Sequence, residues 1–364
     1  MDRNPAIVRR SPEIVQWTVE KVKNNLELEP RHIIAPDLYG NFWLNSEPIA
    51  LHEHRGEIIL IDFWSYTSIK SIRTLPYIQE WQKKYEAFGL IVVGVHTPEY
   101  EFASSLEYVQ NAVKKFNIHY PVMLDNEAFI WNSYGVRAWP TRCLIDRDGY
   151  IRFVQHGEGG YVEFERGIQQ LLSDAGSRGE LPALTVPFRE EDRAGAVCFH
   201  PTSELHLGYL RGALGNTEGY NPESTLEYID PGMYLPERCY AAGKWMNQRQ
   251  CLRFDGSEGE NGSIVIPYQA FEVNAVMGSR NGSLCEVAVQ QNNLPLMKEV
   301  FGEDIVLFPK KHTSLFVGIP RMYTIVRNKE FENHILKLST SNPNLEIYSF
   351  SFTTSVIPEL ISEN

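Results

Sequence analysis

The stretch DFWSYTSIKSIRTLPYI, residues 62–78, decides the fold of the chain. Its first residues continue the apolar run EIILIDFW (57–64), which Gly56 bounds and which is typical of a strand covered on both faces. From Ser68 onward the apolar residues recur at helical spacing, which predicts a helix over 68–88. A buried strand therefore runs directly into an amphipathic helix, with Ser68 and Ser71 in its first turn.

Strands and helices alternate beyond this stretch. The pattern predicts strands at 90–97, 120–125, 141–149 and 150–157, and helices at 104–116, 127–134 and 162–174. Such alternation is typical of an α/β domain with parallel strands, here ending in a hairpin that turns at Asp148-Gly149. Before the stretch, Ser11 and Pro12 predict the start of a helix over 11–27, and the turn residues of 35–51 predict a hairpin.

The character of the sequence changes after residue 176. Residues 177–200 mix Gly, Pro and charged residues without lasting periodicity, as a linker does. Beyond them, short β-type runs are separated by turn residues at intervals of roughly ten residues, which predicts an all-β jelly-roll sandwich. We therefore expect an N-terminal helix and lead-in (1–33), an α/β domain (34–176), the linker (177–200) and the sandwich (201–358).

Composition excludes several classes of protein. The 364 residues are 43% hydrophobic, which is normal for a globular chain of two domains, and the net charge of -12 argues against nucleic-acid binding. No stretch approaches the eighteen apolar residues of a membrane span, and the N-terminus lacks the apolar core of a secretory signal. The five cysteines are widely spaced and odd in number, which excludes a dense disulfide framework and known metal-ligand spacings.

The quoted motifs resemble a known group. APDLYGNFWLNS, IDFWSYTSIKSIRTLPYI, GVHTPEYEF, YPVMLDN and YGVRAWPTRCLIDRDGYI occur in the order shown by thioredoxin-fold proteins of the TlpA and DipZ type. The segments LHLGYLRG, AGKWMNQRQCLRF and EIYSFSF resemble the carbohydrate-binding-module-like sandwich that follows this fold in DipZ C-terminal regions. The expected architecture is thus an α/β thioredoxin-like domain followed by an all-β, carbohydrate-binding-module-like jelly roll.

By this resemblance, Ser68 and Ser71 stand at the two cysteine positions of a Cys-x-x-Cys motif. Trp64 precedes the motif, Asp62 is the buried carboxylate beneath it, and Pro140 is the cis-proline that faces it. Disulfide exchange requires a thiolate that attacks sulfur and a second thiol that resolves the mixed disulfide. Serine hydroxyls support neither step, so the motif as written cannot exchange disulfides.

Other chemistry at the motif lacks support in the sequence. Ser68 would need a general base to act as a nucleophile, and nothing brings Asp62, His96 or His156 to it as part of a triad. Cys143 follows Pro140 in a predicted core strand, where a buried free cysteine acts as a small hydrophobic residue. Asp62 is expected to have an inherited structural role, either hydrogen-bonded or protonated. No cofactor and no metal site is predicted; His52 and His54 lack further ligands.

A site that no longer exchanges disulfides can still bind a peptide. A peptide or partner protein is expected along the cis-proline groove, which the resemblance places at Trp64, Trp139 and Thr141 beside Pro140. On the sandwich, the candidates for stacking on a sugar and binding its hydroxyls are Trp245, Tyr209 and Arg211. Aromatic residues of β-rich domains pack into cores more often than they bind sugars, so these remain candidates only. Cys239 and Cys251 are expected to be unpaired.

Two functions fit these observations. The first is a redox-inactive thioredoxin-fold protein that binds a peptide or glycan as a scaffold. The second is a thiol-disulfide oxidoreductase of the TlpA and DipZ type whose cysteines are replaced here by natural loss or by engineered substitution. Location divides along the same line: the resemblance implies the periplasm or cell envelope, whereas the N-terminus, which lacks a signal peptide, favours the cytoplasm.

Overall fold

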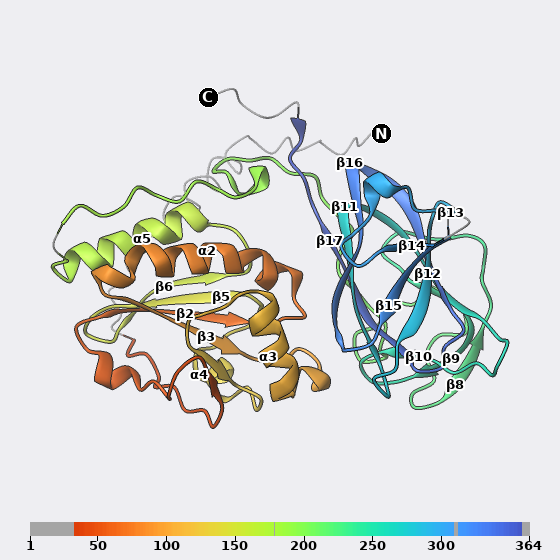
Figure 1. Cartoon of the computed structure of the whole chain (residues 1–364), viewed down its shortest axis with the longest axis horizontal. Helices are drawn as coiled ribbons and strands as arrows, with labels where there is room; N and C mark the ends of the chain where they lie inside the picture. Colours follow the sequence, from red (N-terminus) through yellow and green to blue (C-terminus); the bar gives the residue numbers. More distant parts are fainter. Residues whose placement is uncertain (1–32, 178, 309–311, 359–364) are drawn as a thin grey trace, which may run out of the picture.

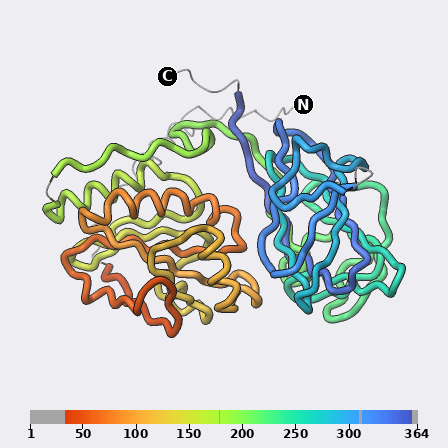
Figure 2. The backbone as a smooth tube through the Cα atoms, viewed as in Figure 1, coloured from red at the N-terminus to blue at the C-terminus, as the bar shows by residue number. Residues whose placement is uncertain are grey.

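The computed structural model describes residues 33–177, 179–308 and 312–358. An α/β domain and a β-rich domain lie side by side, and the segment that joins them runs along one edge of the pair (Figures 1 and 2). Among the described residues, none of the helices has the length and hydropathy that crossing a bilayer requires. The predicted helix over 11–27 lies outside the described residues.

The first domain is built on a six-stranded sheet in the order β1-β4-β3-β2-β5-β6. The strands are β1 (Trp43–Leu44), β2 (Ile58–Trp64), β3 (Leu90–His96), β4 (Val122–Leu124), β5 (Thr141–Ile145) and β6 (Ile151–His156). β2, β3 and β4 are parallel, whereas β5 runs antiparallel to β2 and forms the predicted hairpin with β6. Every residue of β2 is buried, as its unbroken apolar run predicts. The thioredoxin-like α/β prediction is confirmed.

Helices cover both faces of this sheet. They are α2 (Ile69–Tyr85), α3 (Leu106–Lys115), α4 (Phe129–Ser133) and α5 (Tyr161–Asp174). Residues of α2, α3 and α5 pack with alternate residues of β2 in one apolar core, and α2 and α5 lie above the sheet in Figure 1. Ile130 of α4 packs with Ile61 and Phe63 in a second core on the opposite face. The first turn of α2 is therefore placed directly after a rigid, doubly covered strand.

The predicted hairpin over 35–51 is wrong. In its place, β1 pairs with β4 at the edge of the sheet, and a 3₁₀ helix covers Leu51–His54. The turn signals at Gly40, Asn45 and Pro48 mark loops on either side of a two-residue edge strand. His52 and His54 each contact a carboxylate, from Asp37 at 2.6 Å and from Glu57 at 2.8 Å.

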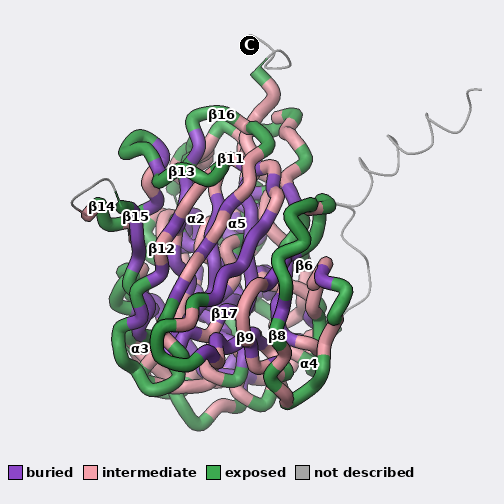
Figure 3. Tube along the Cα trace, turned by 90° about the vertical axis from the view of Figure 1, so that its right-hand side faces the viewer, coloured by how far each residue is buried: buried purple, intermediate pink, exposed green. Residues whose placement is uncertain are grey.

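The second domain is a β-sandwich, as predicted. Its hydrogen-bonded path runs β14-β15-β12-β16-β11-β17-β10-β9-β8, with β13 and β7 attached. The strands are β7 (Leu205–His206), β8 (Thr225–Tyr228), β9 (Tyr240–Asn247), β10 (Leu252–Phe254), β11 (Gly262–Ser279), β12 (Cys285–Gln291), β13 (Leu294–Pro295), β14 (Val306–Phe308), β15 (His312–Val317), β16 (Arg321–Thr340) and β17 (Leu345–Thr353). Neighbouring strands on this path are antiparallel, and their inward-facing residues form one apolar core. Figure 3 shows the buried stretches along the strands and the exposed residues at the turns.

The two domains share a smaller apolar cluster. Tyr100 packs with Cys251, Val276, Met322 and Tyr348 of the sandwich, and residues of α2 lie against the same cluster. The Tyr100 hydroxyl donates to Ser349 Oγ at 2.8 Å. The β-rich domain therefore packs against the end of the α/β domain that carries the serine motif.

The joining segment binds to both domains. The Tyr77 hydroxyl of α2 donates to Asp192 at 2.8 Å and accepts from the Phe188 amide at 2.9 Å. Further along, the Phe199 amide donates to the Ser355 carbonyl at 3.0 Å. The predicted linker is thus extended but attached at both ends.

Candidate functional site

The serine motif forms the N-terminus of α2. Ser68 is the N-cap residue, with extended backbone dihedrals, and its Oγ accepts from the Ser71 amide at 3.4 Å. Ser71 is fully buried, and its Oγ accepts from the Ser65 amide at 3.3 Å. An N-cap hydroxyl stabilises the helix by satisfying a free amide of its first turn. In this chain the two side chains therefore hydrogen-bond to the backbone around the start of α2.

A cis peptide bond joins Trp139 to Pro140. The Thr141 hydroxyl donates to the Ala138 carbonyl at 2.8 Å, and the Trp139 indole donates to the Thr97 carbonyl at 3.0 Å. The Trp139 ring also packs on Trp131, with centroids 4.4 Å apart. Trp139 is half-buried, whereas Thr141 and Pro140 are buried, so of these three residues Trp139 has the most surface for a partner.

Asp62 lies beneath the motif on β2 and pairs in register with Arg142 of β5. Both side chains are fully buried, and neither Asp62 oxygen has a hydrogen-bond partner among the described residues. Burial raises the pKa of Asp62 to about 7, and the Arg142 guanidinium opposes this rise. The sequence predicts that Asp62 is either hydrogen-bonded or protonated. Because its oxygens have no hydrogen-bond partner among the described residues and its pKa is raised, the carboxyl is partly protonated at neutral pH.

Arg142 is held by rings and carbonyls. Its guanidinium lies 4.9 Å from the Tyr161 ring centroid and 5.0 Å from that of Phe164, and it donates to the Gly159 carbonyl at 2.5 Å. Burial lowers the pKa of Arg142, and Tyr161 and Asp62 oppose this change. Arg142 is not among the residues that the resemblance names, and the sequence signal for it is an arginine inside the apolar strand TRCLI (141–145).

The other residues near the motif, Trp64, His96 and Cys143, are buried and provide neither a general base nor a thiolate for catalysis. Trp64 is fully buried and packs edge-on against His96, with ring centroids 5.2 Å apart, so it offers no surface to a partner. Burial lowers the pKa of His96 to about 3, and no described histidine hydrogen-bonds to Ser68. Cys143 belongs to the core on the sheet face opposite α2, and burial raises its pKa to about 12. A triad at Ser68 thus has no base in the described structure.

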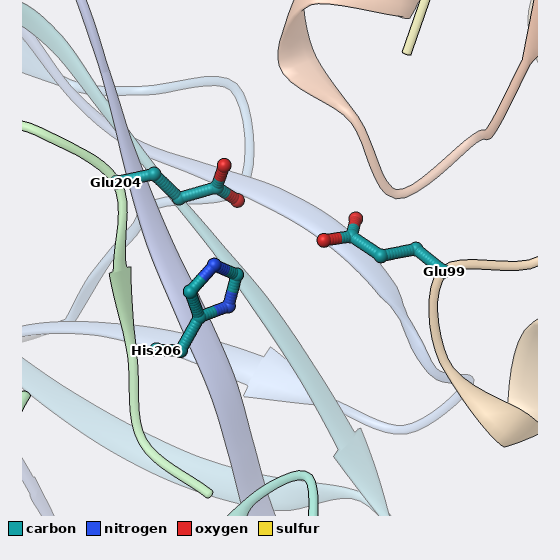
Figure 4. A group of neighbouring side chains, drawn as sticks. All are labelled: Glu99, Glu204 and His206. Carbon is teal, nitrogen blue, oxygen red and sulfur yellow. The ribbon is translucent and has the colours of Figure 1, made fainter. Parts of the chain in front are cut away.

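Glu99, Glu204 and His206 face one another across the domain boundary, next to the motif (Figure 4). The Glu99 side chain is only 5% exposed; it accepts from Thr67, which directly precedes the motif, at 3.2 Å and from Arg211 at 3.1 Å. One ligand atom from each member of the trio lies within 4.8 Å of the others. The sequence carries no signal for this group, because its members come from two domains and no spacing pattern connects them.

Burial shifts the pKa of each member of this group toward its neutral form. Burial raises the pKa of Glu99 to about 7, with Glu204 adding to the rise and Arg211 opposing it. Desolvation also raises the pKa of Glu204, and it lowers the pKa of His206 to about 4. Glu99 is therefore partly protonated near neutral pH, whereas Glu204 belongs to an exposed residue position.

Replacing Arg211 with Gln should weaken the contact between the domains. The change leaves the buried Glu99 carboxylate without its cation, which should cost about 2 kcal/mol of unfolding free energy at pH 8 and less at pH 6, where Glu99 is protonated. Urea unfolding followed by tryptophan fluorescence measures both values. Arg249→Gln is the control, because Arg249 pairs with Glu101 at 3.7 Å while both side chains are largely exposed. That variant should lose under about 0.5 kcal/mol, and equal losses for both would contradict the assignment.

Among the sugar-binding candidates of the sandwich, the prediction for Trp245 is wrong. Trp245 is 1% exposed, donates its indole hydrogen to the Ala242 carbonyl at 2.9 Å and packs against Phe254 in the core. It has no free face for a pyranose ring. Arg211 binds Glu99 of the other domain, and the Tyr209 hydroxyl donates to Glu223 at 3.0 Å. The strand alternation of β9 explains the burial of Trp245, because alternate residues of a sandwich strand face its core.

Fold and site together define a thioredoxin-like domain joined to a β-rich domain, and comparison with known families agrees. Residues 34–154 match the AhpC/TSA family, and residues 202–353 match the family described as thioredoxin like C-terminal domain.

Several named proteins are similar to parts of this chain. The chain is 30% identical over 327 residues to Protein DipZ of Mycobacterium bovis, an alignment that covers 87% of this chain and 42% of DipZ. It is 27% identical over 152 residues to thiol-disulfide oxidoreductase ResA of Bacillus cereus, covering 42% of this chain and 82% of ResA. The crystal structure of a thiol-disulfide isomerase from Corynebacterium glutamicum is 23% identical, with a TM-score of 0.35, and covers 38% of this chain and 97% of its own. The chain thus spans less than half the length of the DipZ proteins.

Proposed function

We propose that this chain is a thioredoxin-fold protein of the TlpA and DipZ type that binds a partner polypeptide beside Ser68 and Trp139 without exchanging disulfides with it. The observation that carries the proposal is the use of Ser68 and Ser71 as hydrogen-bonding groups at the start of α2. The backbone of a thioredoxin-type site is retained there, while the atom that performs its redox chemistry is replaced by oxygen.

A second candidate function is thiol-disulfide oxidoreduction, which the names of the ResA and DipZ relatives favour. In this chain it would need another thiol at the motif. The cysteine nearest in sequence to the cis-proline is Cys143, whose thiol lies in the core on the opposite face of the sheet with a pKa of about 12. The thiolate that attacks a disulfide is therefore scarce at neutral pH. A glycan partner is not proposed, because the aromatic candidate Trp245 is buried.

Binding of an unfolded polypeptide without free thiols tests the proposal. Reduced and carboxymethylated α-lactalbumin, labelled with a fluorophore, should raise its anisotropy on addition of the full chain. Ser68→Trp should weaken this binding by about tenfold, because the indole would occupy the half-buried position at the edge. Ser133→Trp is the matched control, since it makes the same change at an exposed position on α4, and it should bind as the original chain does.

Two results would overturn the proposal. One is equal binding by the Ser68→Trp variant and the original chain, which would place the partner elsewhere. The other is catalytic reduction of insulin by the original chain, which would establish the second candidate instead.

A further inference from the structure

A path of hydrogen bonds joins the β-rich domain to the turn that precedes α2. Arg211, which follows β7, donates from Nη1 to Glu99 Oε1 at 3.1 Å, and the other oxygen of this carboxylate accepts from the Thr67 hydroxyl at 3.2 Å. Thr67 is fully buried, and the Glu99 side chain is 5% exposed. One buried carboxylate therefore contacts the β-rich domain with one oxygen and the turn with the other.

The path continues into the turn through Ser65. The hydroxyls of Ser65 and Thr67 are 2.8 Å apart, and both residues are fully buried. Because Thr67 gives its single hydroxyl hydrogen to Glu99, Ser65 must donate to Thr67. The backbone of Ser65 closes the turn: its carbonyl accepts from the Ser68 amide at 3.1 Å, and its amide donates to Ser71 Oγ at 3.3 Å. A chain of hydroxyls thus leads from Glu99 to the serine motif.

The protonation state of Glu99 decides the direction of this chain. An ionised carboxylate only accepts hydrogen bonds, so it holds the Thr67 hydroxyl as a donor, whereas a protonated carboxyl can donate and reverse the chain. Burial raises the pKa of Glu99 to about 7, Glu204 adds to the rise, and Arg211 opposes it. Both directions are therefore accessible near neutral pH, and residues of the β-rich domain set the balance between them.

The remaining titratable groups near Glu99 or its neighbour Glu204 do not supply the counter-charge of Glu99. They are His206 of the β-rich domain, which Figure 4 shows beside the two carboxylates, Tyr100 and, on α2, Lys70. Desolvation lowers the pKa of His206 to about 4 and raises that of Tyr100 well above its usual range, so both are neutral at pH 7. Lys70 acts on Glu204, where it opposes the rise in pKa that burial causes. The guanidinium that is hydrogen-bonded to Glu99 is therefore the cation that favours its charged form.

We propose that Arg211 is a positioning residue for the serine motif: from the β-rich domain it holds Glu99 as a carboxylate, which orients the Thr67 hydroxyl and the turn that begins α2. The second domain thereby regulates the polypeptide site of the first. Its effect on partner binding rests on the proposed function, whereas its effect on the turn does not.

The amide chemical shifts of Ser65 and Thr67, followed from pH 5.5 to pH 8.5 in the full chain, test this coupling without a partner. Both amides should titrate with a midpoint of about 7, because both hydroxyls belong to the chain that Glu99 orients. Arg211→Gln should raise the midpoint by at least about one pH unit, since an opposite charge close to a carboxyl lowers its pKa. Arg211→Lys keeps the charge and should restore most of this shift, and Glu99→Gln should abolish the titration.

Arg249→Gln is the matched control. Arg249 has the same charge and belongs to the same domain, but it pairs with Glu101 at 3.7 Å while both side chains are largely exposed, so its loss should leave the midpoint unchanged. Glu99→Gln keeps the shape of the side chain and tests the coupling even if Arg211→Gln separates the domains. Three results would overturn the coupling: amides that do not titrate, a titration that persists in Glu99→Gln, or equal midpoints in the two arginine-to-glutamine variants.

Anisotropy of the labelled, carboxymethylated α-lactalbumin gives the functional readout. Because ionised Glu99 fixes the turn, its affinity for the original chain should rise about threefold from pH 6 to pH 8, and its affinity for Glu99→Gln should stay constant. Equal pH dependence in the two chains would contradict regulation of the site by Arg211. Absence of any binding would instead overturn the proposed function, and the amide titration would still decide the coupling.

Discussion

The Ser68→Cys/Ser71→Cys double variant should reduce insulin in the presence of dithiothreitol on the order of 100-fold faster than the original chain. The amides at the start of α2, including that of Ser71, would then face a thiol, and a helix N-terminus lowers the pKa of a thiol placed there. Position 68 is half-buried and accessible for attack, whereas position 71 is buried and suits the resolving thiol. Turbidity of precipitating insulin chains measures the rate.

The single variant Ser68→Cys is the control for this experiment. It has an attacking thiol without a resolving partner, so it should form a stable mixed disulfide and show little turnover. Equal rates for the double variant and the original chain would mean that the motif is not a dormant exchange site. The proposed retention of the site's backbone would then be wrong.

Between pH 5 and pH 8 the unfolding free energy of the original chain should decrease. In the Asp62→Asn variant this decrease should be smaller by about 3 kcal/mol. The pKa of Asp62 is about 7 in the folded chain and 3.8 as a free side chain, so the folded state binds more protons between these values. Stability contributed by the protonated carboxyl is therefore lost as the pH rises toward 7. Asn has the shape of the protonated acid and cannot ionise, so the variant should be similar at pH 5 and more stable at pH 8.

Urea unfolding at pH 5, 6, 7 and 8 measures this dependence. Glu99 contributes a change of the same sign, because its pKa is also raised to about 7, and that part should remain in the variant. Asp148→Asn serves as the control, since its side chain is 67% exposed and the substitution should leave the pH dependence intact. If Asp62→Asn and the original chain show parallel curves, Asp62 ionises in the folded state as freely as in water.

Local pattern predicted most of the α/β domain. The apolar run of β2 and the helical spacing that follows Ser68 are strong signals, and the turn at Asp148-Gly149 marks the last hairpin. The edge strand β1 escaped prediction because two residues carry no periodicity. Its position depends on pairing with β4, which is remote in sequence.

The candidate site was only partly predictable. Ser68, Ser71 and Asp62 are neighbours in sequence, so one motif identified them. Arg142 and the contact between Glu99 and Arg211 depend on how strands and domains are placed in space, which sequence spacing does not encode. Trp245 shows the converse difficulty: its residue type suits a sugar platform, but the alternation of its strand directs the ring into the core.

The segment between the domains has a mechanical consequence. Its Asp192 side chain accepts a hydrogen bond from Tyr77 of α2, and its Phe199 amide donates to the carbonyl of Ser355, two residues beyond the end of β17. A force that pulls on residue 358 would act on the hydrogen bond between Phe199 and Ser355 before it acts on β17. Because the joining segment is attached to both domains, we expect the two domains to rotate in solution as one body and not independently of each other.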